Sequence, residues 1–481
     1  VLAHLIALFH EDDLEQAVRA ALQEVQGTYG LAVVSADQPD VLVAARNGSP
    51  LIVGVGDGEY VVASDASAIV EHTTQAIYLG DNEMCVMTRN GFHTTTLDAA
   101  PVTKPIHDVE FSLEQIELGG HEHFMLKEIV EQPEAIRMCL RGRIDRREGR
   151  VHLGGIAAYG RELVQARRVI FSACGTAWHA GLIGEYLFED LARVPAETEY
   201  ASEFRYRNPV INNGTVVIAL SQSGETADTL AALREARDRG ALALGIVNVV
   251  GSSIARETDA GIYLHVGPEI GVASTKAFTG QVMVLALLSL YLARRRHMSR
   301  ERCEWMLAEL ASVPDKMERV LEQADHVREV TLKYVERENW LFLGRGYNYP
   351  TALEGALKLK EISYIHAEGM PAAEMKHGPI ALIDDGMPAV FIATKGSQYD
   401  KVINNIEEVR SRGGHVIAVA TEGDTEIAQH ARDVLFIPDI AEPLSPILAV
   451  VPLQLMAYEA AVARGHDVDR PRNLAKSVTV E

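Results

Sequence analysis

The chain contains an internal repeat, and this repeat limits the possible folds more than any other feature. Its two halves align when the sequence is shifted by roughly 171 to 174 residues. Each half alternates short Val, Ile and Leu runs with helix-length periodic segments, a pattern typical of βαβ units around a parallel sheet. The matching pairs are residues 169–175 with 340–346, 203–205 with 374–376, 216–221 with 389–394, and 240–247 with 414–419. The sequence therefore predicts an α/β protein with two tandem domains, each a parallel sheet in a three-layer αβα arrangement.

The segment before the repeat has a different pattern. Between residues 29 and 70, short β-branched runs are separated by turn sequences such as Asn-Gly-Ser-Pro and Gly-Asp-Gly, which predicts an antiparallel sheet. Pro101 and Pro105 mark a linker, and helical periodicity resumes at Phe124. We expect four parts: an antiparallel domain, a linker with the first α/β domain, the second α/β domain and a tail, over residues 1–113, 114–297, 298–465 and 466–481.

One loop in the first half of the repeat is rich in hydroxyl groups. Residues 221–226 (SQSGET) follow the apolar run 216–220 and precede a segment with helical spacing. The N-terminus of a helix offers free N–H groups and a partial positive charge, so it binds phosphate without Lys or Arg. The alternative is an ordinary helix capped by Ser or Thr. The second half has TKGSQ at the equivalent residues 394–398, so only the first half keeps this loop.

Composition excludes several classes of protein. A formal net charge of −22 argues against nucleic acid or an anionic membrane as partner, because the field of the protein would repel both. The apolar run of residues 282–293 is too short to span a bilayer and predicts a buried helix. The four cysteines have no CxxC spacing and fit a reducing cytoplasm, and the scattered histidines predict no metal site. No cofactor is expected.

Three polar residues share one face of a predicted helix over residues 351–362. Glu354, Lys358 and Glu361 follow one another at steps of four and three. They could form a surface ion-pair ladder. The rest of this helix is nearly apolar, however, which suggests that the polar face lines a cleft where a carboxylate could move a proton between adjacent sugar carbons.

Two further residues are candidates for chemistry. His377 lies in a turn (KHGP) and could act in catalysis or as a structural hydrogen-bond partner. Lys476 lies in an unusually specific C-terminal tail, although termini are commonly frayed. It could be exposed and idle; if closure of the tail desolvated it, its neutral amine could attack a ketone carbon and form a Schiff base.

Together, these segments closely resemble the glutamine:fructose-6-phosphate amidotransferase family, also called glucosamine-6-phosphate synthases. The resemblance runs the length of the chain and rests on SACGT at 172–176, SQSGET at 221–226, EIGVASTK at 269–276, ALEGALKLKEI at 352–362, KHGP at 376–379 and RPRNLAKSVTVE at 470–481. It implies two sugar-isomerase (SIS) domains after a glutaminase domain of the N-terminal nucleophile type. It also implies fructose 6-phosphate and glutamine-derived ammonia as substrates, and a homodimer whose active site is shared between subunits.

The resemblance assigns roles to individual residues. Lys476 would form the Schiff base at the C2 ketone, Glu361 would carry the proton between C1 and C2, and His377 would help to open the sugar ring. Lys358 and Ala475 would also contact the substrate. The remaining implied binding residues, which hold the phosphate or contact the sugar, are Thr176, Ser221, Gln222, Ser223, Thr226, Val272 and Ser274.

The front of the chain departs from the family pattern. The N-terminal Cys nucleophile of the glutaminase domain is not present, and residues 1–113 resemble only the later part of that domain. We therefore expect this polypeptide not to hydrolyse glutamine. Two alternatives to full synthesis are simple isomerisation of fructose 6-phosphate, or amination with free ammonia. A sugar-phosphate sensor is the non-enzymatic alternative, but it would be expected to carry a basic DNA-binding segment and does not explain Glu361, His377 and Lys476 together.

Overall fold

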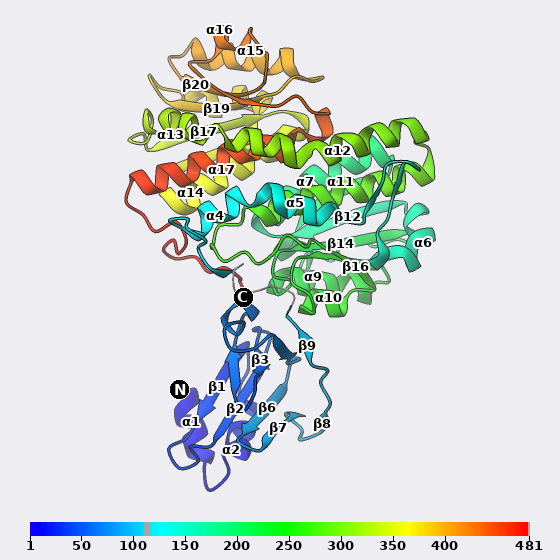
Figure 1. Cartoon of the computed structure of the whole chain (residues 1–481), viewed down its shortest axis with the longest axis vertical. Helices are drawn as coiled ribbons and strands as arrows, with labels where there is room; N and C mark the ends of the chain where they lie inside the picture. The colour runs from blue at the N-terminus through cyan, green and yellow to red at the C-terminus, as the bar shows by residue number, and fades with distance from the viewer. Residues whose placement is uncertain (110–115, 480–481) are drawn as a thin grey trace.

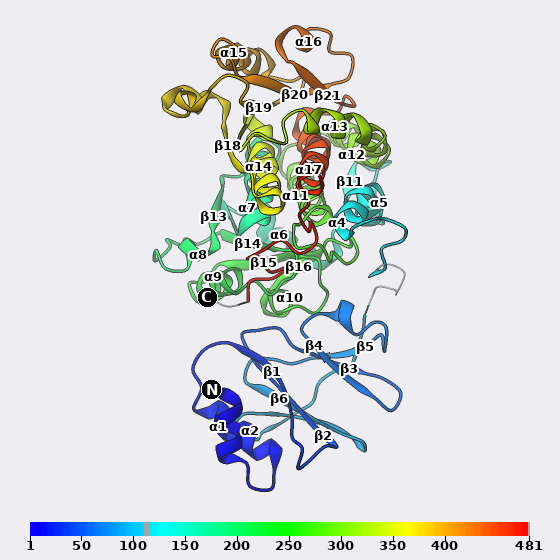
Figure 2. The same ribbon diagram turned by 90° about the vertical axis from the view of Figure 1, so that its left-hand side faces the viewer.

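We analysed a computed structural model of the chain, which describes residues 1–109 and 116–479. Figures 1 and 2 show a small N-terminal domain below a larger body that contains the two repeat halves. The small domain faces the helices α9 (Ala227–Asp238) and α10 (Ser253–Glu257) of the first half. The predicted boundary between residues 113 and 114 lies outside the described residues, as do the last two residues of the predicted tail.

The N-terminal domain consists of two antiparallel sheets and two helices, as its alternating pattern predicts. One sheet has the order β1 (Tyr29–Val34), β2 (Val41–Asn47), β6 (Glu83–Thr88), β7 (Gly91–Thr96) and β8 (Pro101–Val102). The other has the order β4 (Tyr60–Ala63), β3 (Ile52–Val55), β5 (Gln75–Tyr78) and β9 (His107–Asp108). Alternate residues of β2 face opposite sides: Val43 packs against α1 (Leu2–Phe9) and α2 (Leu14–Gln23), and Ala44 packs against the second sheet.

A linker joins this domain to the first parallel sheet. It contains α4 (Phe124–Val130), α5 (Gln132–Leu140), the hairpin of β10 (Ile144–Asp145) and β11 (Arg150–Val151), and α6 (Gly160–Val164). Short turns of helix occur there and elsewhere in the chain: η1 (Ala66–Ala68), η2 (Gly154–Tyr159), η3 (Phe188–Ala192), η4 (Gly346–Asn348) and η7 (Glu442–Leu444).

The first parallel sheet has the order β13 (Ala196–Tyr200), β12 (Arg168–Ala173), β14 (Thr215–Ser221), β15 (Leu242–Val247) and β16 (Ala260–Tyr263). Both faces are covered by helices, which explains why its strands are apolar runs rather than alternating ones. Ile218 faces the side of α7 (Gly175–Leu187) and α11 (Lys276–Arg296), whereas Val217 and Ala219 face the side of α8 (Ala201–Phe204), α9 and α10.

The second parallel sheet repeats the same strand order, which confirms the predicted tandem α/β fold. It runs β18 (His366–Pro371), β17 (Asn339–Gly344), β19 (Pro388–Ala393), β20 (His415–Thr421) and β21 (Asp433–Ile437). One face carries α12 (Arg300–Leu321), α13 (Ala324–Leu332), α14 (Tyr349–Ser363) and α17 (Ser445–Ala463), and the other carries α15 (Tyr399–Arg410) and α16 (Ile427–His430).

The two halves share one large core. By length and composition alone, two segments of the described chain could cross a membrane, Lys276–Arg296 and Glu442–Ala463, but their apolar windows are 100% and 83% buried inside the fold. Residues 282–293 are thus a buried helix, as predicted, with every side chain of this run at most 5% exposed. Both long helices are apolar on all sides, and together with α7 and α14 they belong to the one core that joins the two halves.

Candidate active site

The hydroxyl loop lies where the sequence places it, between the carboxyl end of β14 and the start of α9. Ser221 Oγ is 3.1 Å from Thr226 Oγ1 and accepts a hydrogen bond of 3.0 Å from the Gly224 N–H. The Glu225 N–H donates to Ser223 Oγ over 3.2 Å. Gly224 has φ +68°, and a Cβ there would lie 2.0 Å from the Ser252 hydroxyl oxygen, so a side chain at this position would disrupt the loop.

Thr176 lies in the equivalent loop after the neighbouring strand β12, at the start of α7. Its hydroxyl donates to Glu354 Oε1 over 3.0 Å and accepts from Lys358 Nζ over 3.0 Å. Glu354 and Lys358 belong to α14 of the second half. Thr176 therefore joins the phosphate-type loops of the first sheet to the polar face of a helix in the second.

The polar face of α14 is buried, so the reading as a surface ion-pair ladder is wrong. The side chains of Glu354 and Lys358 are 0% and 1% exposed, and that of Glu361 is 21% exposed. Lys358 Nζ lies 2.7 Å from Glu361 Oε2 and 3.5 Å from Glu354 Oε1. Burial alone would lower the pKa of Lys358, but the two carboxylates raise it above its ordinary value, so this lysine is a permanent cation at neutral pH.

The C-terminal tail crosses from the second half to the first and reaches the start of α9 at Val478 (Figure 2). The carboxylate of Asp469 accepts from the N–H groups of Phe124 and Met125 at the start of α4, and its carbonyl accepts from the Val272 N–H. Further along, the Val478 carbonyl accepts a hydrogen bond of 3.1 Å from the Ala227 N–H, the first residue of α9. The tail is therefore a built part of the site rather than a frayed end.

Lys476 forms an ion pair with a buried carboxylate. Its Nζ donates to Glu269 Oε2 over 2.8 Å and to the Gly271 carbonyl over 2.7 Å. Burial alone would raise the pKa of Glu269, but the Lys476 ammonium and the N–H groups of Ala277 and Thr275 lower it to about 2. The structure thus gives Lys476 an anionic partner, and not the apolar surroundings that the sequence argument required for a neutral amine.

The other sequence-predicted contacts surround these groups. Ser274 Oγ donates to Glu269 Oε2 over 2.9 Å, and Val272 is half-buried beside the tail. Ala475 is exposed. The Gln222 carbonyl accepts from the Asn248 N–H over 3.1 Å, which ties this loop to the end of β15.

The third predicted catalytic residue, His377, lies at the surface of the second half. It is exposed at the end of η5 (Ala372–His377), ahead of η6 (Pro379–Leu382), and its neighbour Lys376 pairs with Glu408 of α15. Within residues 1–109 and 116–479, no hydrogen bond or ion pair joins His377 to Glu361 or Lys476.

Sequence reasoning missed two residues that organise the site. Glu269 accepts hydrogen bonds from Ser274, Thr275, Ala277 and Lys476, and so caps the start of α11 while it holds the tail. His179 Nδ1 lies 2.7 Å from Glu354 Oε2, and its position three residues after Thr176 on α7 is the only local signal for this contact. Glu269 is the first residue of the EIGVASTK segment, but its partner Lys476 is 207 residues away in the sequence.

Glu128 of α4 is a further buried acid of the site, after Glu354 and Glu269. Its carboxylate accepts hydrogen bonds from the N–H groups of Ile270 and Gly271, which directly follow Glu269. Burial and the nearby Glu269 carboxylate raise the pKa of Glu128 to about 8, against the opposing effect of Lys476 and Lys276. Its folded-state pKa thus exceeds the unfolded value of roughly 4.3.

This raised pKa predicts a pH-dependent stability. The contribution of Glu128 is fully present below the unfolded pKa and is lost as pH rises through about 8. Relative to Glu128→Gln, the free energy of unfolding of the unmodified chain should therefore fall from pH 6 to 8.5, with a steepest slope of about 1.4 kcal/mol per pH unit. Denaturant titration at several pH values checks this, with the exposed Glu134→Gln on α5 as control; parallel curves for the chain and Glu128→Gln would contradict it.

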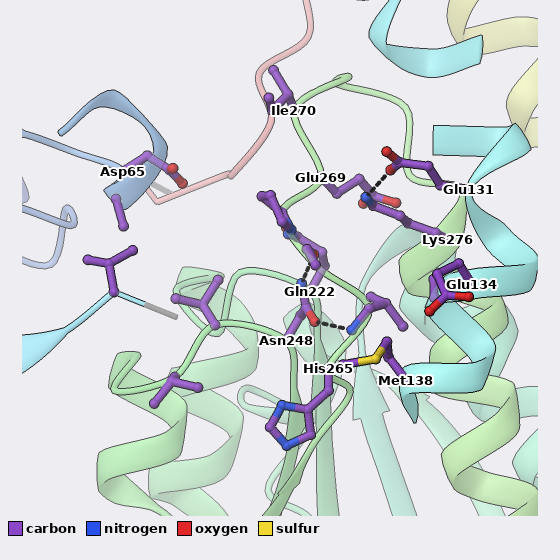
Figure 3. A pocket seen from close by; sticks show the side chains of 18 of the residues that line it. Asp65, Glu131, Glu134, Met138, Gln222, Asn248, His265, Glu269, Ile270 and Lys276 are labelled. Atoms are coloured by element: carbon purple, nitrogen blue, oxygen red, sulfur yellow. Dashed lines mark hydrogen bonds and ion pairs between the residues drawn. The ribbon is translucent and has the colours of Figure 1, made fainter. Parts of the chain in front are cut away.

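A cavity of about 510 Å³ lies between the N-terminal domain, α5 and the end of the first parallel sheet (Figure 3). Lys276 crosses one wall and pairs with Glu131 over 2.9 Å. Gln222 and Glu269, which belong to the loops described above, contribute to the wall on the side of the active site. The remaining labelled lining residues are Asp65, Glu134, Met138, Asn248, His265 and Ile270.

Comparison with known proteins agrees with this architecture. Residues 162–291 and 333–464 match the SIS domain family, one match in each half of the repeat. The chain is 59% identical to the glutamine–fructose-6-phosphate aminotransferase (isomerizing) of Chlorobaculum tepidum, over 100% of this chain and 79% of that protein. It is 54% identical to the protein of the same name from Bacteroides thetaiotaomicron, over 98% of this chain and 77% of that one.

Comparison with a solved structure also points to this family. The C-terminal domain of glucosamine-fructose-6-phosphate aminotransferase from Francisella tularensis matches 74% of this chain and all of that domain, with a TM-score of 0.70 and 36% identity. The fold and the site thus define a protein with two tandem SIS domains. Within that class, the chain belongs to the glutamine–fructose-6-phosphate aminotransferase (isomerizing) family.

Proposed function

We propose that the chain converts fructose 6-phosphate and ammonia, derived from glutamine, into glucosamine 6-phosphate and water. The observation that carries this proposal is the buried series of contacts from Glu361 through Lys358 to Thr176. It places an acid and a fixed cation of one SIS domain next to the phosphate-type loops of the other. Such a site can hold a sugar phosphate at one end and move protons at the other. The four cysteines are unpaired, in keeping with a cytoplasmic enzyme.

The phosphate group is held by hydroxyl and N–H donors after β12 and β14. Ser221, Ser223 and Thr226 supply hydroxyl groups, and Thr176 supplies another once the phosphate replaces Glu354 as the acceptor of its hydrogen bond. Gln222 adds an amide, and α9 adds the partial positive charge of its N-terminus. Val272, Ser274 and Ala475 then border the sugar. This assignment fixes the direction of the substrate, because C1 and C2 must point toward α14 and the tail.

The chemistry begins when His377 helps to open the ring and exposes the C2 ketone. Lys476 is an ammonium paired with Glu269 before the reaction, so it first releases a proton to solvent; its neutral amine then adds to C2 and expels water, which gives a Schiff base. Ammonia then displaces the lysine amine and leaves an imine of fructose 6-phosphate. Glu361 removes a proton from C1 and returns one to C2, which yields the amino aldose, while the Lys358 cation stabilises the negative charge that develops near O1.

A homodimer explains the position of His377. Since this residue is exposed and, among the described residues, has no hydrogen bond or ion pair with Glu361 or Lys476, we assign it to the site of a neighbouring subunit. Co-expression of His377→Asn chains with Lys476→Arg chains should then restore about one quarter of the unmodified activity, because half of the dimers are mixed and each contains one intact site.

Each variant alone should be inactive in this test. Mixing Glu361→Gln with Lys476→Arg serves as the control, because both changes affect residues of the same chain's site and no intact site can form. Recovery in the control, or none in the test pair, would refute the shared site.

Product analysis tests the proposed reaction as a whole. Fructose 6-phosphate is incubated with the chain alone, with an ammonium salt and with glutamine, and the products are followed by NMR. Glucosamine 6-phosphate in the ammonium arm supports the proposal. Glucose 6-phosphate in every arm without amino sugar would favour the isomerase alternative, and the glutamine arm reports whether this chain releases ammonia itself.

A further inference from the structure

We propose that Arg46 of the N-terminal domain is a positioning residue for the phosphate loop of the first SIS domain, because it neutralises the loop carboxylate of Glu225. This inference rests on the proposed role of residues 221–226 in holding a sugar phosphate. It adds that the affinity of this loop depends on a residue in another domain.

Arg46 is a buried cation between two domains. Its side chain is 3% exposed, although it belongs to β2 of the N-terminal sheet. One nitrogen donates to the Leu79 carbonyl over 3.1 Å, and the other lies 3.2 Å from Asp81 Oδ1. The same nitrogen lies 3.7 Å from Glu225 Oε2 and 3.4 Å from Ser253 Oγ, both in the first SIS domain. The figures show this contact region, where the small domain meets α9 and α10 (Figures 1 and 2).

Two hydrogen bonds from Ser253 hold the carboxylate of Glu225 on the side of Arg46. Its Oε1 accepts from the Ser253 N–H over 2.8 Å, and its Oε2 accepts from the Ser253 hydroxyl over 2.7 Å. The Gly224 carbonyl also accepts from the Ile254 N–H over 2.9 Å. The loop that offers its hydroxyl groups to an anion therefore turns its one carboxylate toward Arg46, and the side chain of Glu225 is only 12% exposed.

The charges of Arg46, Glu225 and the phosphate explain why the Arg46–Glu225 contact matters for phosphate binding. A phosphate dianion in the loop would be repelled by a carboxylate within the same six residues, and the repulsion is strong where water is excluded. The Arg46 guanidinium offsets it. A partly buried carboxylate without its cation is also costly in itself, so the loop would move to expose Glu225 to water and lose its hydroxyl geometry. Both effects weaken phosphate binding when Arg46 is lost.

Calorimetric titration with fructose 6-phosphate tests this inference. Arg46→Met should weaken binding about tenfold, and Arg46→Lys, which keeps the charge, should stay within about threefold of the unmodified chain. The double variant Arg46→Met/Glu225→Gln should recover to within about threefold, since it removes the uncompensated carboxylate. In steady-state assays, Arg46→Met should raise KM and leave kcat nearly unchanged.

Arg234→Met is the matched control. Arg234 pairs with Asp81 and Glu257 at the same interface. Among the described residues it has no ion pair with the loop, so its loss should leave the affinity unchanged. Equal weakening by Arg46→Met and Arg234→Met would overturn the inference, as would a double variant that binds no better than Arg46→Met.

If Arg46→Met does not fold, the affinity of Glu225→Gln for fructose 6-phosphate tests the inference instead. Binding at least as tight as that of the unmodified chain supports the inference, and a tenfold loss overturns it. An unmodified chain that binds no fructose 6-phosphate would instead contradict the proposed function.

Discussion

Replacement of Lys476 by Arg should abolish amination of fructose 6-phosphate, with a loss of at least about a thousandfold in kcat. Arginine keeps the positive charge, so the ion pair with Glu269 and the closed position of the tail can persist. A guanidinium, however, is not deprotonated in proteins and cannot attack the C2 ketone. The expected result is a folded protein that binds fructose 6-phosphate with near-normal affinity and forms no glucosamine 6-phosphate in the NMR assay.

Lys360→Arg is the control for this change. Lys360 is exposed on α14, so the same substitution there should have no effect on amination. A Lys476→Arg variant that aminates at near-normal rates would refute the Schiff-base role.

Replacement of Glu361 by Gln should stop proton transfer between C1 and C2 while leaving the sugar phosphate bound. Gln has nearly the same shape but cannot accept a proton, so we expect the isomerisation rate to fall by a factor of about 10² to 10⁴. The measurement is exchange of the C1 hydrogen of fructose 6-phosphate with solvent deuterium, followed by NMR. This readout reports the proton transfer at C1 without requiring that the amino aldose is formed and released.

The Glu361→Gln variant also loses the ion pair with the buried Lys358, and this needs its own control. Titration with fructose 6-phosphate reports whether the site still forms, and the exposed Glu368→Gln on β18 shows the effect of an ordinary loss of charge. Normal deuterium exchange in Glu361→Gln would show that another group moves the proton.

The fold could be predicted because its signals are local and repeated. Apolar strands and periodic helices recur in both halves, and each strand is short enough to be read from a few residues. The repeat then predicted the second sheet from the first, and the structure has the same strand order in both. The burial of Glu354 and Lys358 was also indicated locally, by the apolar residues around them on α14.

The missing parts of the site come from contacts between distant segments. Glu269 and Lys476 are 207 residues apart, and Arg46 is equally far from Ser253, so no periodicity or spacing connects them. The surroundings of Lys476 could not be predicted for the same reason, because they come from a distant segment of the chain. The sequence suggested a desolvated amine, but only the folded chain shows that Glu269 already occupies the position beside it. A single sequence shows which residues could form such contacts, but it does not show which of them pair with each other.

The most direct test of the proposed mechanism is chemical trapping of the Schiff base. The unmodified chain is incubated with fructose 6-phosphate, reduced with borohydride, digested and analysed by mass spectrometry. We expect one sugar phosphate attached to Lys476, no adduct without substrate and none in Lys476→Arg. Absence of any adduct in the unmodified chain, or attachment to a different lysine, would contradict it.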